Sequence, residues 1–285
     1  MRSMIPVEFL VVFFGLMSAI CWGAGDFSGG FASKRANVYS VVLITQIVGI
    51  FLLAFSAHLM AEKMPPFGGM LWGAVAGVFI GIGLLALYRG LSQGNMGFVA
   101  PVSAIVAASV PVIYSAFYEG LPAFHQIIGF AFALVAVWLI AGGGNGNSKI
   151  ERTDLILPLI AGMGFGLFFI SIDKVSDTAV LWPLTAARIA AAITLIIFIT
   201  LKRQVYIPPK SVFPIIFIAG IFDTGGNTFF AFASQAGRLD IASITSSLYP
   251  AGTVLLAWLI LKEKLSSKQW LGLATALLAI IFISA

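Results

Sequence analysis

The stretch GMLWGAVAGVFIGIGLLALYRG, residues 69–90, decides the fold class of this chain. Its only charged side chain is Arg89, one residue before the end. A helix of roughly 20 apolar residues crosses the hydrocarbon core of a bilayer, so this stretch predicts a transmembrane helix. Glycines recur every four residues along it and form one smooth helix face. Such a face indicates either tight helix packing or a surface on which a neighbouring helix slides.

Similar apolar runs lie on both sides of this stretch. Hydrophobic residues make up 60% of the 285 residues and charged residues only 9%, whereas soluble domains carry about 25% charged residues. The composition therefore excludes an ordinary soluble protein. We predict an all-α membrane protein with ten transmembrane helices, at 7–31, 39–61, 69–90, 97–118, 124–142, 155–172, 180–201, 212–234, 241–261 and 268–285.

The two halves of the chain resemble each other. At a shift of 142 residues Ser92-Gln93 falls on Ser234-Gln235, and at a shift of 144 Glu119-Gly120-Leu121 falls on Glu263-Lys264-Leu265. We therefore predict two five-helix repeats, residues 1–142 and 155–285, joined by a Gly/Asn-rich linker at 143–154. Because each half has an odd number of spans, the second is inverted in the membrane, an arrangement frequent among secondary transporters.

Loop charges predict the orientation. The loops after odd-numbered spans hold eleven Lys and Arg residues, against four in the N-terminus and the other loops. Positive residues stay on the cytoplasmic side, so we expect the odd-numbered loops there and both termini outside. We expect a multi-pass protein of the plasma (cell inner) membrane, with the first apolar run retained as a span. The net charge of +5 does not indicate a nucleic-acid partner, because the basic residues lie between apolar runs.

Metal and cofactor chemistry has little support in the sequence. The chain has one cysteine, Cys21, and two histidines, His58 and His125, far apart in the sequence. None belongs to a ligand-spaced pair. We expect no metal and no cofactor.

A charged side chain inside a membrane needs a partner or a water-filled cavity, and Asp26 in the first span is such a side chain. It follows Trp22 by four residues, so the two share a helix face, and the residues between them are small. Asp26 either contacts a ligand or proton, or lies at the interface paired with Lys34 or Arg35. The sequence leaves these two alternatives equal.

The eighth span carries a second polar face. Asp223, Asn227 and Phe230 recur at helical spacing and present a carboxyl, an amide and an aromatic ring on one side. We interpret this face as part of a ligand cavity rather than as a buried network between helices. At a shift of 142, Asp223 and Asn227 correspond to Gly81 and Leu85, so the second half carries more of the polar chemistry.

Arg188 is the charged residue of the seventh span. We expect it to pair with Asp223 or another acid, with contact to an anionic substrate group as the alternative. At a shift of 142 it corresponds to Gln46. Trp22, Tyr88, Trp182 and Tyr249 are aromatic cavity candidates because they adjoin small or polar residues. For Glu119 and Glu263, at helix ends, we expect a cap or an ion pair.

Several of these features together resemble the EamA-type members of the drug/metabolite transporter superfamily. The matching features are ten spans in two repeats, Trp22-Gly23 in the first span, and Arg188 followed by small residues in the seventh. The most specific stretch is Ser246-Ser247-Leu248-Tyr249-Pro250, with Glu263 thirteen residues after the proline and then Gly272. The first repeat departs from this pattern, since its prolines, Pro101 and Pro111, lie eighteen and eight residues before Glu119.

The resemblance implies an alternating-access carrier with a cavity lined by spans one, three, four, six, eight and nine. Members of the family move amino acids, sugars and other metabolites, often with proton coupling. We expect a secondary transporter of a small organic solute, such as an amino acid or a sugar, that works by proton-coupled efflux as a monomer or homodimer. The alternatives are an integral-membrane enzyme acting on lipid-linked phosphates and a passive channel. The sequence does not select the substrate.

Overall fold

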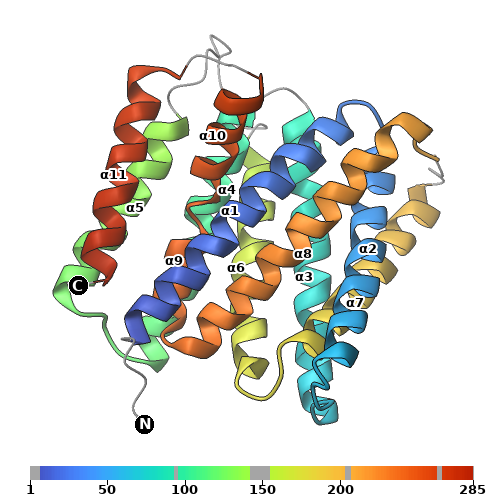
Figure 1. Cartoon of the computed structure of the whole chain (residues 1–285), viewed down its shortest axis with the longest axis horizontal. Coiled ribbons are helices and arrows are strands. Elements are labelled where there is room, and N and C mark those ends of the chain that lie inside the picture. Colours follow the sequence, from blue (N-terminus) through green and yellow to red (C-terminus); the bar gives the residue numbers. More distant parts are fainter. Residues whose placement is uncertain (1–6, 93–95, 142–154, 203–206, 262–264, 285) are drawn as a thin grey trace.

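The computed structural model of the chain describes residues 7–92, 96–141, 155–202, 207–261 and 265–284. In these residues the regular secondary structure is helical, as the apolar runs predict (Figure 1). The linker at 143–154 and Glu263 lie outside the described residues. The elements are α1 Val7–Ser33, α2 Val38–Leu59, α3 Phe67–Ser92, α4 Met96–Tyr118, α5 Phe124–Ala141, α6 Ile156–Ser176, α7 Leu181–Lys202, the 3-10 helix η2 Lys210–Val212, α8 Phe213–Ala236, α9 Leu239–Ser246, α10 Tyr249–Leu261 and α11 Ser267–Ser284.

Within the described part of the chain, seven helices are long and apolar enough to cross a membrane. They are Glu8–Ser33, Val38–Leu59, Phe67–Ser92, Val99–Tyr118, Ile156–Ser176, Leu181–Leu201 and Lys210–Ala236. Two further apolar helices, Phe124–Ile140 and Ser267–Ile283, are shorter. The protein is therefore an all-helical, multi-pass membrane protein. Nine of the ten predicted runs each coincide with one helix to within a few residues.

The remaining run, 241–261, is divided into α9 and α10, so the prediction of one continuous helix there is wrong. At the break the N–H of Leu248 donates to the carbonyl of Thr245, and the N–H of Ala251 donates to Leu248, both three residues back. Pro250 favours the break, because it has no N–H for the carbonyl of Ser246 and its ring would clash with that carbonyl. The break brings the start of α10 to the centre of the bundle.

The glycine face of α3 packs against α7. A Cβ atom on Gly77 would lie 2.1 Å from the carbonyl oxygen of Ala187, so the two backbones are in direct contact. Close approach of this kind is what regularly spaced small residues provide between membrane helices. The same register gives two more contacts, Gly73 with Pro183 and Gly81 with Ala191.

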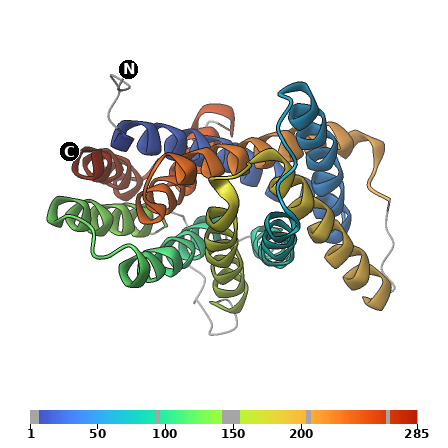
Figure 2. The same ribbon diagram turned by 90° about the horizontal axis from the view of Figure 1, so that it is seen from below.

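The helices are arranged in pairs around the centre. α1 packs along α8, and α3 along α6, in the middle of the molecule. α5 packs on α11 at one edge and α2 on α7 at the other, as Figure 2 shows from below. The start of α1 and the end of α11 lie toward the same end of the bundle (Figure 1). The central pairs α1–α8 and α3–α6 surround the polar residues described next.

Candidate functional site

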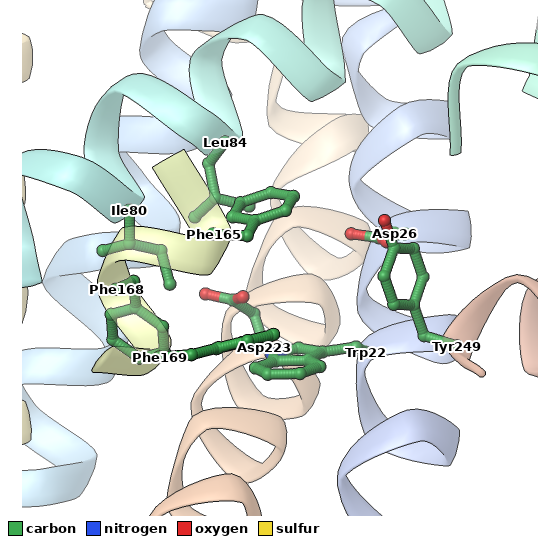
Figure 3. Close-up of a pocket in the computed structure, with 9 residues that line it drawn as sticks. All are labelled: Trp22, Asp26, Ile80, Leu84, Phe165, Phe168, Phe169, Asp223 and Tyr249. Atoms are coloured by element: carbon green, nitrogen blue, oxygen red, sulfur yellow. The ribbon is translucent and has the colours of Figure 1, made fainter. Parts of the chain in front are cut away.

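A small cavity lies between the central helices (Figure 3). Its volume is about 20 Å³, and a water molecule needs about 10–15 Å³ by the same measure. Nine residues from α1, α3, α6, α8 and α10 line it: Trp22, Asp26, Ile80, Leu84, Phe165, Phe168, Phe169, Asp223 and Tyr249. Two carboxyl groups thus lie in a cavity whose other lining side chains are aromatic or aliphatic.

The α1 side of the cavity contributes Trp22 and Asp26. Asp26 is 6% exposed, and its carboxyl group points into the cavity (Figure 3). Gly25 lets α1 approach α8 closely, because a Cβ there would lie 3.1 Å from the backbone nitrogen of Asp223. Among the described residues, Asp26 forms no hydrogen bond or ion pair, so the expected alternative of a pair with Lys34 or Arg35 is not found there.

The opposite side of the cavity contains an ion pair. Arg188 of α7 and Asp223 of α8 are buried, and Nη1 of Arg188 bonds to Oδ2 of Asp223. The same Nη1 donates to Oε1 of Gln46 on α2, at 2.9 Å. Gly49 makes room for this arrangement, because a Cβ there would lie 2.9 Å from Nε of Arg188. The expected pairing of Arg188 with Asp223 is therefore present.

Four polar atoms around this ion pair have no hydrogen-bond partner in the described part of the chain. They are Nε2 of Gln46, Nε and Nη2 of Arg188, and Oγ1 of Thr224. Buried polar groups are normally satisfied. Arg188 therefore retains N–H groups that Asp223 and Gln46 do not use, although Arg188 is not one of the nine lining residues.

Aromatic rings form one wall of the cavity. Phe169 stacks on Phe230 with ring centroids 4.3 Å apart, and Trp22 stacks on Phe169 at 5.5 Å and on Phe230 at 6.0 Å. The indole N–H of Trp22 donates to Oδ1 of Asn227 at 3.0 Å. Gly226 gives the indole its space, since a Cβ there would lie 2.4 Å from the ring. The polar face predicted on α8 thus holds Trp22 in position.

Two tyrosines near the cavity are held by backbone groups. The hydroxyl of Tyr249 lies 2.7 Å from Oγ of Ser103 and donates to the carbonyl of Ala100 at 3.1 Å. The hydroxyl of Tyr88 donates to the carbonyl of Gly25 at 3.4 Å. Tyr249 lines the cavity, whereas Tyr88 is buried behind it.

A second polar cluster lies at the end of the bundle where α4 ends and α9 begins. Arg238 pairs with Asp240 at 2.7 Å and donates to the carbonyl of Gly120 at 2.9 Å. The side chain of Glu119 accepts a hydrogen bond from Ser115. Partial burial, reinforced by Asp240 and Asp173, raises the pKa of Glu119 above its ordinary value. The hydrogen bond and charge of Asp240 raise the pKa of Arg238.

The structure brings most of the predicted site residues together. Trp22, Asp26, Asp223 and Tyr249 line the cavity, and Arg188, Asn227, Phe230 and Tyr88 contact the lining residues or the helix that carries them. Trp182 is elsewhere, since its indole donates to the backbone carbonyl of Glu62. Glu62 in turn accepts hydrogen bonds from the first N–H groups of α7.

Sequence reasoning missed the phenylalanines of α6 and the aliphatic pair on α3. The internal repeat contained a signal for four of them, the first being Phe165, which lies 143 residues after Trp22. At the same shift Phe169 corresponds to Asp26, Ile80 to Asp223 and Leu84 to Asn227. No such signal exists for Phe168, which corresponds to Gly25. The fourth span, which the resemblance implies at the cavity, contributes none of the nine lining residues.

Comparisons with known proteins identify related chains. The EamA-like transporter family matches this chain twice, over residues 9–142 and 153–285. An "Uncharacterized transporter" of Archaeoglobus fulgidus is 22% identical over 202 residues, 71% of each chain. An uncharacterized protein of Methanocaldococcus jannaschii is 28% identical over 134 residues, which are 46% of this chain and 96% of that protein. A protein of known crystal structure superposes with a TM-score of 0.76 over 95% of both chains at 13% identity, which indicates a shared fold.

Proposed function

Because this chain belongs to the EamA-like transporter family, we propose that it is a secondary transporter that moves a small organic solute by alternating access. The family and the named relative point to a transporter rather than an enzyme. The observation that carries the proposal is the cavity between α1, α3, α6, α8 and α10, where two carboxyls and the Arg188 guanidinium gather within membrane-spanning helices. Ionisable groups at such a depth commonly mark a substrate or proton pathway.

The proposal includes two inverted five-helix repeats, with α9 and α10 together forming one broken span. The duplicated family match supports this arrangement. The archaeal relative also supports it, because 96% of that protein aligns over 134 residues, which is the length of one family match. The hydrogen bond between Gln46 and Arg188 joins residues 142 apart, which is the repeat spacing. The contacts of α5 with α11 are reciprocal: Gly129 meets Ile283, and Gly272 meets Ile140.

The two repeats would meet at the cavity. Its lining comes from both family-matching regions, with Trp22 and Asp26 from the first and Asp223 and Tyr249 from the second. Rocking of one repeat against the other around a fixed central site is how inverted-repeat carriers alternate access. We propose protons as the coupling ion, and the cell's plasma membrane as the location. The carrier would work as a monomer or homodimer, with a small solute and the lipid bilayer as its partners.

Proteoliposomes test this function. Vesicles containing the purified full chain are given a mixture of amino acids, sugars, nucleosides and amines, and the vesicle contents are measured by mass spectrometry. We expect saturable uptake of at least one solute. That uptake should accelerate when the same solute is preloaded, and should fall when an ionophore collapses the pH gradient. A flux that does not saturate and shows no counterflow would indicate a channel, and no flux above protein-free vesicles would reject a transport function.

A further inference from the structure

Asp26 is the cavity carboxyl without a partner. Asp223 is neutralised by Arg188, whereas no cation or hydrogen-bond donor bonds Asp26 among the described residues. At 6% exposure, its carboxyl points into the cavity rather than toward water outside the bundle. An ionised carboxyl without a partner is strongly disfavoured inside a membrane. A proton or a bound ligand must therefore supply its positive charge.

Apart from Asp26, the N–H and O–H groups of the nine lining residues are already in use, and the unused N–H groups of Arg188 belong to a residue outside the lining. The Trp22 indole N–H donates to Asn227, and the Tyr249 hydroxyl bonds to the Ala100 carbonyl. A sugar needs partners for several hydroxyls, and an amino acid needs a donor for its carboxylate. Polar ligand groups left without partners oppose binding. The lining therefore suits a ligand with one charged group and an otherwise apolar surface.

Aromatic rings surround the same space. Trp22 meets Phe169 face to face at 5.5 Å and Tyr249 edge to face at 6.4 Å, and Phe165 lies across the cavity (Figure 3). The faces of aromatic rings attract cations, especially organic ammonium groups. Aromatic rings beside a carboxyl without a partner favour a cation over an anion or a neutral polar solute.

We infer that the solute is a monovalent organic cation with an apolar body, and that its charge binds at Asp26 in place of a proton. This inference rests on the transport function proposed above and assigns its substrate class. No other carboxyl in the lining is available, because Asp223 is bonded to Arg188.

Charge balance makes the exchange one for one. With Asp26 protonated, the Arg188–Asp223 pair leaves the cavity neutral; with Asp26 ionised and a cation bound, it is again neutral. The carboxyl O–H bond breaks as the cation enters, and the proton leaves to water. The titratable and charged groups on the helices around Asp26 are Tyr88 on α3, Arg188 on α7, Asp223 on α8 and Tyr249 on α10.

The cavity must widen to admit such a ligand. Its 20 Å³ is close to the room that a single water needs. α1 and α10 meet through glycine backbones, since a Cβ on Gly23 would lie 2.9 Å from the Cα of Gly252. At Gly23 and Gly252 themselves no side chains would have to separate, and α10 starts at the break beside Pro250. These features make α10 the helix best suited to move.

The test uses phenyltrimethylammonium as the cation and tert-butylbenzene as the uncharged molecule of the same shape, with benzoate as an anion. Binding to the purified full chain in detergent is followed by thermal shift and by calorimetry in buffers of different ionisation enthalpy, which counts released protons. We expect the cation alone to raise the melting temperature, with about one proton released per cation bound. Asp26→Asn should abolish the proton release and weaken binding about 30-fold or more.

Asp177→Asn is the matched control, since Asp177 is an exposed aspartate outside the cavity. It should leave affinity and proton release unchanged. Equal binding of tert-butylbenzene or benzoate, or proton release that persists in Asp26→Asn, would overturn the inference. If Asp26→Asn does not fold, the proton count and the three-ligand comparison on the unaltered protein still decide.

Vesicle counterflow separates failure of this inference from failure of the transport function. Counterflow of a sugar or an anion, unaffected by the cation, would overturn the cation class and leave the transporter standing. A cation that binds and releases a proton but shows no counterflow would overturn the transport function and leave the cation site.

Discussion

Asp223 and Asp26 reach the same cavity from two packed helices, and they differ in what lies beside them. Asp223 is bonded to Arg188, which is itself anchored by Gln46. Asp26 has no such partner in the described residues, although α1 and α8 are in close contact beside it. A buried charge that is permanently compensated can stabilise one arrangement of helices, whereas an uncompensated one can exchange its counter-ion. We therefore assign Asp223 to the structure of the site and Asp26 to its chemistry.

The largest effect should come from breaking the pair. Arg188→Met leaves Asp223 buried without its cation, and removing one partner of a buried pair typically destabilises by about 3–5 kcal/mol. We expect a loss of that size in the free energy of unfolding, measured by denaturant or thermal unfolding in detergent. The double variant Arg188→Met/Asp223→Asn carries no charge at this place. It should recover a large part of the loss, and equal instability of the single and double variants would contradict the role of the pair.

A smaller effect is expected at the other carboxyl. Asp26→Asn replaces a carboxyl group that bonds to no described group and is protonated when no cation is bound, so the free energy of unfolding should change by about 1 kcal/mol or less. Asp223→Asn keeps the same shape but leaves Arg188 uncompensated, and should destabilise several times more. The two variants differ in one respect: Asp223 is paired with a cation, Arg188, whereas Asp26 is paired with none among the described residues. Equal losses in thermal unfolding would remove the distinction between the two aspartates.

The seven long apolar helices were predictable because each depends on the summed hydrophobicity of about 20 residues, which tertiary packing cannot reverse. The break before α10 was not predictable from its proline alone. Pro101 and Pro111 also stand inside an apolar run, yet α4 continues through both. A proline inside an apolar run therefore does not by itself tell a broken helix from a continuous one.

The polar half of the site was predictable for a similar reason. Asp26, Asp223 and Arg188 stood out because a charge in a membrane is costly wherever the helix faces. The apolar half could be predicted only through the repeat spacing, which relates Phe169 to Asp26 but relates Phe168 only to Gly25. The sequence could suggest that Arg188 pairs with an acid, but the absence of a partner for Asp26 depends on the three-dimensional arrangement.

The smallest effect is expected at a third carboxyl, outside the spans. Partial burial, with Asp240 and Asp173 nearby, raises the pKa of Glu119, while Arg238 and Ser115 act in the opposite direction. A raised pKa means that the folded protein holds this proton more tightly than the unfolded chain. The contribution of Glu119 to stability is therefore present at low pH and is lost as pH rises through its folded-state pKa.

Glu119→Gln should accordingly stabilise the protein slightly at pH 7, by less than about 1 kcal/mol because the side chain is exposed. The difference from the unaltered protein should vanish below the ordinary glutamate pKa, where both side chains are uncharged. Melting temperatures of the two proteins between pH 4 and pH 8 measure this. If the glutamate form is the more stable at pH 7, the attraction of Arg238 outweighs burial. Asp223 would then be a strongly paired carboxyl and Glu119 a weakly paired one, whereas Asp26 has no partner among the described residues.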